Sequence, residues 1–242
     1  MTDDDRHALG PPSRPIEAVL FDLHFTLVRQ RDSRAWIAAA RAATGRAGTF
    51  DDGLDAAAAG QLLDGLDHLW ARAEAIDPGN RRDLDAATHR AVFGAVVGAL
   101  PGVDDALTAA LYASLLGVWV PYPDTLPVLR ALAALGVRTA VLSNVGIDVR
   151  PMLRRTGIAG LVDAVVLSGE HGVVKPDPAL FQVALTAVGS PAERTLMVGD
   201  NWRDDGAAAG LGIRTLILPD TFSDGHGLSA VLRLVTWPAG PG

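Results

Sequence analysis

The chain has 242 residues, of which 49% are hydrophobic, and it carries a formal net charge of -7 at pH 7. This length and composition predict a globular protein that buries one good core, with room for a smaller appended unit. The absence of cysteine excludes disulfides, thiolate zinc sites and cysteine nucleophiles, and because the basic residues form no stripe, nucleic acid is not an expected partner.

The two ends of the chain predict little folded structure. Residues 1–15, MTDDDRHALGPPSRP, are acidic and contain proline, so they predict a disordered arm, and residues 237–242 predict a short tail. The arm lacks the apolar segment of a secretory signal, and no apolar run in the sequence reaches membrane-spanning length. We therefore expect a cytoplasmic protein with no membrane partner.

The first predicted strand lies in the segment VLFDLHFTLV, residues 19–28, and ends at Asp22. After it, residues 31–120 have a helical pattern throughout, with Ala and Leu at spacings of three and four. The helical stretches are SRAWIAAARAATG, LDAAAAGQLLDGLDHLWARAEA, DLDAATHRAVFGAVVGAL and VDDALTAALYASLLGVWV. The pattern predicts a bundle of roughly four helices, inserted as a domain of its own after the first strand.

From residue 121 the pattern alternates between short apolar runs and helices. The runs VRTAVLSN, VDAVVLSG, RTLMVGD and IRTLILP each predict a buried parallel strand, and helices such as TLPVLRALAALG and PALFQVALTAVG separate them. This alternation predicts an α/β fold with a doubly wound parallel sheet. Since the first strand belongs to the same sheet, the core domain comprises residues 16–30 and 121–236.

Polar residues follow the predicted strands at the edge where a doubly wound sheet binds its ligands. They are Asp22, His24 and Thr26 after the first strand, Ser143 and Asn144 after the second, Lys175 in a later loop, and Asp200, Asp204 and Asp205 in VGDNWRDD. Lys175 is the only lysine among 21 basic residues. This exception favours a functional site at Lys175, where the compact ammonium group of lysine is needed and the larger, planar guanidinium of arginine cannot replace it.

This ordered set of motifs resembles the haloacid dehalogenase superfamily. The resemblance covers roughly residues 16 to 218, and all four motifs of that family occur in order. It implies a Rossmann-like core in which residues 31–120 form an inserted helical cap of the C1 type. Two residues depart from the family pattern: His24 stands where the phosphatases have a second aspartate, and Phe25 stands where the family usually has glycine.

The residue types suit covalent phosphoryl chemistry. A carboxylate at a strand tip can attack an electrophilic phosphorus, which fits Asp22 as the nucleophile. A divalent cation relieves the repulsion between two anions, and Asp22 and Asp200 offer the hard oxygen ligands that Mg²⁺ takes. The resemblance adds the backbone carbonyl of His24 as a further metal ligand.

Four residues are predicted to bind the transferring phosphoryl group: Thr26, Ser143, Asn144 and Lys175. We expect Ser143 to lie beside backbone N–H groups that open the next helix, and the charge of Lys175 to face Asp22 as well as the phosphoryl group. The family resemblance implies a supporting role for Asp205, together with Asp204, at the metal waters or the lysine. Alternatively, these acids only complement the positive end of a helix.

His24 has two interpretations. An imidazole has an ordinary pKa of about 6.5, so it can protonate a leaving oxygen and then deprotonate water near neutral pH. Alternatively, His24 fills space and contributes only its backbone carbonyl. The sequence leaves both open.

Magnesium-dependent hydrolysis of a small phosphorylated metabolite through an aspartyl-phosphate is the leading prediction. A phosphonate-cleaving member needs a lysine in its cap, and residues 31–120 contain none. A metal-free 2-haloacid dehalogenase remains an alternative, although such members usually replace the acid that GDN keeps here. A catalytically impaired binding protein is a third hypothesis, because of His24 and Phe25.

The substrate itself is not predicted beyond a small phosphorylated molecule, and a homodimer is compatible with the sequence. Family members of this type carry specificity residues on the inserted helices, although core packing is the default role of a helical aromatic residue. The candidates are Arg29, Arg31, Trp36, His68, Trp70 and His89.

Overall fold

A computed structural model describes residues 15–46 and 48–236 of the chain. The predicted tail and all of the predicted arm except Pro15 lie outside these residues. Within them, no helix combines the length and the apolar character that crossing a bilayer requires.

The centre of the fold is a sheet of five parallel strands in the order β5-β4-β1-β6-β7. Its strands are β1 (Ala18–Phe21), β4 (Arg138–Ser143), β5 (Ala164–Leu167), β6 (Thr195–Gly199) and β7 (Arg214–Ile217). The predicted α/β fold with a doubly wound parallel sheet is confirmed. Because β1 pairs with both β4 and β6, the residues that follow these three strands meet at one edge of the sheet.

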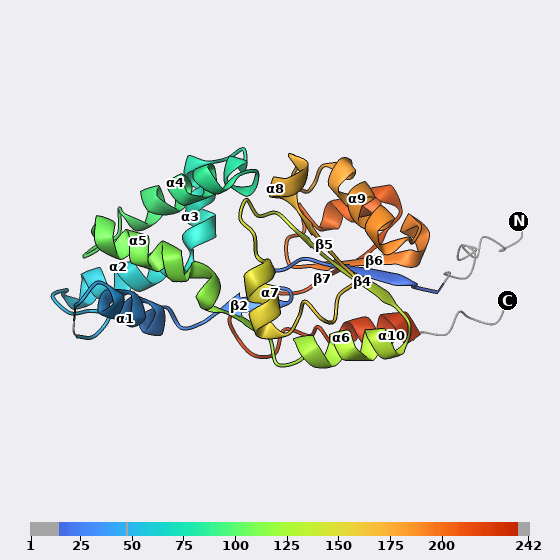
Figure 1. Ribbon diagram of the computed structural model, residues 1–242, viewed down its shortest axis with the longest axis horizontal. Helices are drawn as coiled ribbons and strands as arrows, with labels where there is room; N and C mark the ends of the chain where they lie inside the picture. The colour runs from blue at the N-terminus through green and yellow to red at the C-terminus, as the bar shows by residue number, and fades with distance from the viewer. Residues whose placement is uncertain (1–14, 47, 237–242) are drawn as a thin grey trace, which may run out of the picture.

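Alternate residues along β1 enter two different cores, as the period of a strand requires. Val19 and Phe21 face the helices α6 (Thr125–Ala134), α7 (Arg150–Thr156) and α10 (Ala230–Thr236). Ala18 and Leu20 face α9 (Pro178–Val188) and the 3₁₀ helix η4 (Gly206–Leu211). Figure 1 shows α6 and α10 below the sheet and α9 above it. A short helix, α8 (Ser168–His171), follows β5, and another 3₁₀ helix, η3 (Ala192–Arg194), precedes β6.

The inserted segment forms a separate helical layer with its own core, which we call the cap (Figure 1). The described part of the cap has five helices, where the sequence predicted about four. They are α1 (Ser33–Ala43), α2 (Ala56–Asp67), α3 (Leu69–Ile76), α4 (Ala86–Val97) and α5 (Asp105–Ser114), with the 3₁₀ helices η1 (Arg81–Asp83) and η2 (Leu115–Gly117). The additional helix arises because the stretch predicted as one helix over 54–75 breaks at His68, which ends α2 and begins α3.

Aspartates determine where several cap helices begin. The carboxylates of Asp55, Asp85 and Asp104 each accept a hydrogen bond from the backbone N–H three residues later, at the starts of α2, α4 and α5. An N-cap of this kind satisfies one of the unpaired donors of the first turn. The acidic residues of the cap therefore have structural roles as well as lowering the net charge.

Two short antiparallel strands connect the cap to the sheet domain. β2 (Val28–Gln30) pairs with β3 (Trp119–Pro121), with Val28 opposite Pro121. The prediction that a helix continues through residue 120 is therefore wrong, because residues 119–121 form β3. The aromatic and β-branched residues Trp119 and Val120 suit a strand, and β2 provides the pairing partner.

The backbone of the cap loop around η1 contacts the sheet domain closely on one side of the site. The Ser168 hydroxyl donates to the backbone carbonyl of Asp83 at 2.5 Å and accepts from the N–H of Val145 at 2.8 Å. A Cβ on Gly146 would lie 2.8 Å from the backbone carbonyl oxygen of Asp85 and closer still to that of Arg82. The loop around η1 can therefore approach this closely only because residue 146 has no side chain.

This contact predicts the effect of Gly146→Ala. The added methyl group must push the cap loop away from the sheet domain, which should lower the free energy of unfolding by about 1–3 kcal/mol. Gly160→Ala is the matched control, because a Cβ there meets nothing within 4 Å. Urea unfolding of the two variants measures the difference, and equal stability would show that the contact does not constrain the cap.

Candidate active site

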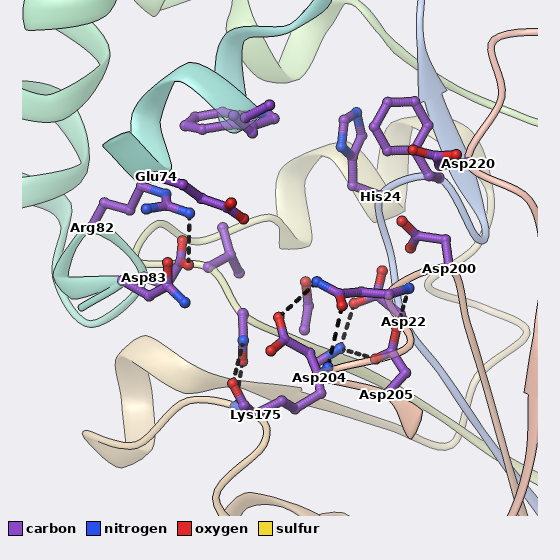
Figure 2. A pocket seen from close by; sticks show the side chains of 18 of the residues that line it. Asp22, His24, Glu74, Arg82, Asp83, Lys175, Asp200, Asp204, Asp205 and Asp220 are labelled. Atoms are coloured by element: carbon purple, nitrogen blue, oxygen red, sulfur yellow. Dashed lines mark hydrogen bonds and ion pairs between the residues drawn. The ribbon is translucent and has the colours of Figure 1, made fainter. Parts of the chain in front are cut away.

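A cavity of about 270 Å³ lies at the carboxyl edge of the sheet, between the sheet domain and the cap. Asp22, Ser143, Lys175 and Asp200 reach it from the ends of strands or the loops that follow, as the sequence predicted. Figure 2 shows the acids of the sheet domain on one side of this space and Glu74, Arg82 and Asp83 of the cap on the other. The site therefore combines residues that are far apart in the chain, from Asp22 to Asp220.

The ammonium of Lys175 lies between two carboxylates. Nζ is 2.6 Å from Oδ1 of Asp22 and 2.6 Å from Oδ1 of Asp205, and the lysine side chain is only 2% exposed. Burial alone would lower the pKa of Lys175, but the charges of Asp205 and Asp22 outweigh burial and raise it. The lysine is therefore a permanent buried cation beside the predicted nucleophile.

The acids around this cation carry more negative charge than it neutralises. Burial, opposed by Lys175 and reinforced by Asp205, raises the pKa of Asp22 to about 6. Burial and the charges of Asp22 and Asp205 raise the pKa of Asp200 to about 8. A further cation at this point would stabilise the ionised form of both carboxylates.

The donor set fits a hard divalent cation. Carboxylate oxygens of Asp22, Asp200 and Asp205 lie within 4.8 Å of one another. Both oxygens of Asp205 already accept hydrogen bonds, from Nζ of Lys175 and, at 3.0 Å, from the backbone N–H of Asn201. Asp22 and Asp200 are thus the acids that remain able to hold Mg²⁺, a cation that prefers oxygen ligands.

Asn144 lines the cavity, as the sequence predicted, and it also holds the lysine loop. Its Oδ1 accepts from the backbone N–H of Lys175 at 2.7 Å, and its Nδ2 donates to the backbone carbonyl of Lys175 at 2.9 Å. These two bonds use one of the two N–H donors of Nδ2, so Asn144 positions the lysine, and its binding of a phosphoryl group stays a prediction.

Thr26 also differs from the prediction. It is completely buried and does not line the cavity, and its hydroxyl donates to Oδ1 of Asp200 at 3.4 Å. We therefore assign Thr26 to the support of Asp200 in place of phosphate binding.

Ser143 lines the cavity at the end of β4, but the expected helix start is not beside it. Helix α7 begins only at Arg150, seven positions further on, because residues 144–149 form a loop. Asp204 lines the cavity too, and its carboxylate accepts from Nδ2 of Asn201 at 3.1 Å. In the structure, Asp205 contacts the lysine directly and Asp204 belongs to the cavity wall.

His24 lies against aromatic rings. Its imidazole stacks on Trp119, with ring centroids 4.8 Å apart, and also contacts Phe25 at 4.2 Å. Burial lowers the pKa of His24 to about 4, and Nε2 is buried without a hydrogen-bond partner among the described residues. The sequence suggested ionisation near neutral pH, whereas the buried ring is neutral there and carries no proton acidic enough to give to a leaving group.

Phe25 explains why glycine suits the position after His24. Its φ is 60°, in the left-handed region that a residue with a side chain seldom adopts. The phenyl ring contacts His24 and, at 5.1 Å, Phe222, so packing stabilises the unfavourable backbone. Phe25 lines the same cavity as Asp22.

His226 was not among the predicted site residues. Its Nε2 is 2.7 Å from the backbone carbonyl of Thr26, its ring stacks on Tyr122 at 3.6 Å, and Nδ1 is 3.8 Å from Asp124. The residue lies 200 positions after Thr26 and outside every motif. It supports the loop that carries His24 and Phe25, and only the fold brings it there.

Two of the six specificity candidates, Trp70 and His89, line the cavity. Trp36 is buried in the cap core, His68 pairs with Asp64, and Arg29 pairs with Asp224; Arg31 does not line the cavity. The lining residues that were not predicted are Ala71, Glu74, Asn80, Arg82, Asp83, Trp119, Val145, Asn201 and Asp220. A polar loop between two cap helices, GNRRDLD, was the available signal for three of them.

Comparison with known proteins identifies the family. A family model described as a haloacid dehalogenase-like hydrolase matches residues 16–212, so the chain belongs to this family of hydrolases. It is 31% identical over 154 residues to a phosphoglycolate phosphatase of Rhodospirillum rubrum, covering 60% of this chain and 63% of that protein. It is 39% identical over 97 residues to a phosphoserine phosphatase of Thermus thermophilus, covering 39% of each protein. The chain spans about half the length of the curated relatives it matches.

The fold is also shared with dehalogenases. The L-2-haloacid dehalogenase PA0810 superposes with a TM-score of 0.62 at 24% identity, covering 88% of each chain. At this identity the likeness supports the fold and does not choose between phosphate esters and haloacids.

The left-handed backbone at Phe25 generates a prediction. Phe25→Gly and Phe25→Ala remove the same ring, but only glycine also relieves the unfavourable φ. We expect the glycine variant to be more stable than the alanine variant by about 1 kcal/mol. Urea unfolding of the pair measures this difference, and an alanine variant of equal or greater stability would contradict the expectation.

Proposed function

We propose that this member of the haloacid dehalogenase-like hydrolases is an Mg²⁺-dependent phosphatase of small phosphorylated metabolites. The observation that carries the proposal is the arrangement of Asp22 at the end of β1, with one oxygen beside buried Lys175 and with Asp200 within metal-binding distance. Retention of both acids favours phosphoryl chemistry over metal-free dehalogenation, and the phosphatase names of the relatives support it.

In the proposed reaction the free carboxylate oxygen of Asp22 attacks phosphorus. The bond between phosphorus and the ester oxygen breaks, the alcohol leaves with a proton taken up at its oxygen, and Asp22 becomes an aspartyl-phosphate. Water then attacks that phosphorus, which releases inorganic phosphate and regenerates the carboxylate.

The surrounding residues hold these groups in place. Lys175 fixes the second oxygen of Asp22, and the Ser143 hydroxyl lies on the cavity wall where the phosphoryl oxygens would be bound. Mg²⁺, held by Asp22, Asp200 and the backbone carbonyl of His24, would neutralise the phosphoryl charge. Asp205 and Asn144 position the lysine from its two ends.

His24 is proposed as a proton acceptor at most. The neutral ring can take a proton from the attacking water, but it has none to give to a poor leaving group. Because His24 cannot protonate a poor leaving group, there is a second candidate function: the protein binds phosphorylated ligands and hydrolyses them slowly.

Assays with and without metal test the phosphatase function. We expect hydrolysis of phosphate monoesters with Mg²⁺, no hydrolysis in EDTA, and a loss of more than about 1,000-fold in Asp22→Asn, because a neutral amide of the same shape cannot attack. Asp105→Asn, at an exposed position in α5, is the control for a changed charge. Full activity in EDTA together with release of halide from 2-haloacids would instead establish the dehalogenase alternative.

Substitution of His24 tests its part in proton transfer. His24→Asp places an acid where the family has one, so hydrolysis of an alkyl phosphate should rise on the order of 10- to 100-fold, and that of nitrophenyl phosphate much less. His24→Ala should affect the two substrates alike. If His24→Ala instead loses activity selectively on the alkyl ester, His24 is a working general acid and our assignment is wrong.

A further inference from the structure

We propose that the preferred substrate is a phosphate monoester whose alcohol half carries a protonated amine. This inference rests on the proposed phosphatase function and names the chemistry of the leaving group. It follows from the charges and the aromatic rings on the part of the cavity wall that faces away from Lys175.

The cavity is lined by many more acids than bases. Among the described residues, Lys175 and Arg82 are its two permanent cations, against the carboxylates of Asp22, Glu74, Asp83, Asp200, Asp204, Asp205 and Asp220. Mg²⁺ and a phosphate dianion would cancel each other and leave this excess of acid unchanged.

Both cations are already paired with carboxylates of the protein. Lys175 is held by Asp22 and Asp205. Nη1 of Arg82 donates to the backbone carbonyl and the carboxylate of Asp77, at 3.1 and 3.3 Å, and Nη2 is 4.0 Å from Asp83. Arg82, the arginine among the described residues that line the cavity, is thus already paired with Asp77 inside the cap.

Two acids have no such partner. Glu74 of α3 and Asp220 after β7 line the cavity at exposed positions, and neither side-chain carboxylate makes an ion pair or hydrogen bond with another described residue. Figure 2 shows them on opposite sides of the His24 ring. A positive charge bound near this ring would be attracted from both sides.

The aromatic residues supply the second, independent observation. Phe25, Trp70 and Trp119 line the same cavity, and the His24 ring lies between Phe25 and Trp119. The face of an aromatic ring attracts a desolvated cation, and tryptophan does so best. In addition, the unpartnered Nε2 of His24 can accept a hydrogen bond, which an ammonium N–H can give.

Matched substrates test the inference. O-phosphoethanolamine, propyl phosphate and 2-phosphoglycolate have leaving groups of similar size that are cationic, neutral and anionic. With Mg²⁺ present, we expect kcat/KM for phosphoethanolamine to exceed that for propyl phosphate by about tenfold or more, since 1.4 kcal/mol of attraction corresponds to tenfold. Phosphoglycolate should be the poorest of the three.

Variants locate the source of the preference. Glu74→Gln and Asp220→Asn should each raise KM for phosphoethanolamine several-fold, with kcat and the propyl phosphate values nearly unchanged. Glu17→Gln is the matched control, because Glu17 pairs with Arg194 at the opposite end of β1. A preference that survives both cavity substitutions would overturn the assignment of these acids.

The outcomes separate this inference from the proposed function. If all three esters are hydrolysed and the neutral or anionic one is preferred, the inference is wrong and the phosphatase function stands. If none is hydrolysed, calorimetric binding of the same esters with Mg²⁺ to Asp22→Asn decides the inference alone: tighter binding of phosphoethanolamine than of propyl phosphate supports it, and equal or weaker binding overturns it.

Discussion

The burial of one ammonium group determines the geometry of this site. A lysine that is 2% exposed has lost its hydration, so it requires carboxylates close by, and removing both carboxylates would leave an uncompensated buried charge. Asp22 follows β1, Asp205 precedes η4 and Lys175 lies in the loop before α9, so a single cation links three segments of the chain at the edge of the sheet. The orientation of the Asp22 carboxylate is therefore a consequence of the electrostatics that hold the sheet edge together.

The cap adds negative charge to an edge that already has an excess of it. Burial and the charges of Asp77 and Asp204, opposed by Arg82, raise the pKa of Asp83 to about 7, and Glu74 helps to raise the pKa of Asp204. Contact between cap and sheet domain thus brings like charges together. The backbone packing at Gly146 and the paired Arg82 oppose this repulsion, and cations in the cavity would oppose it further.

The sheet and the position of Asp22 at its edge were predictable because both depend on local sequence. Short apolar runs ending in polar residues identify buried parallel strands and the groups that follow them, including Asp22 and Lys175. The contacts of Asn144 and Thr26 were not predictable, since an amide or hydroxyl can bind a phosphate as well as a neighbouring backbone group or carboxylate. His226 and the cap residues on the cavity wall depend on contacts between segments far apart in the sequence, which periodicity does not encode.

Because Lys175 is the single lysine, its chemical modification can report the opening of the site. Reagents that acylate amines need an accessible, deprotonated nitrogen, and Lys175 offers neither while its pKa is raised and its side chain is buried. Every other basic side chain of the chain is arginine or histidine. Acylation of a lysine side chain in the native protein can therefore occur only when this site opens, so the rate of that one modification reports how often the three segments separate.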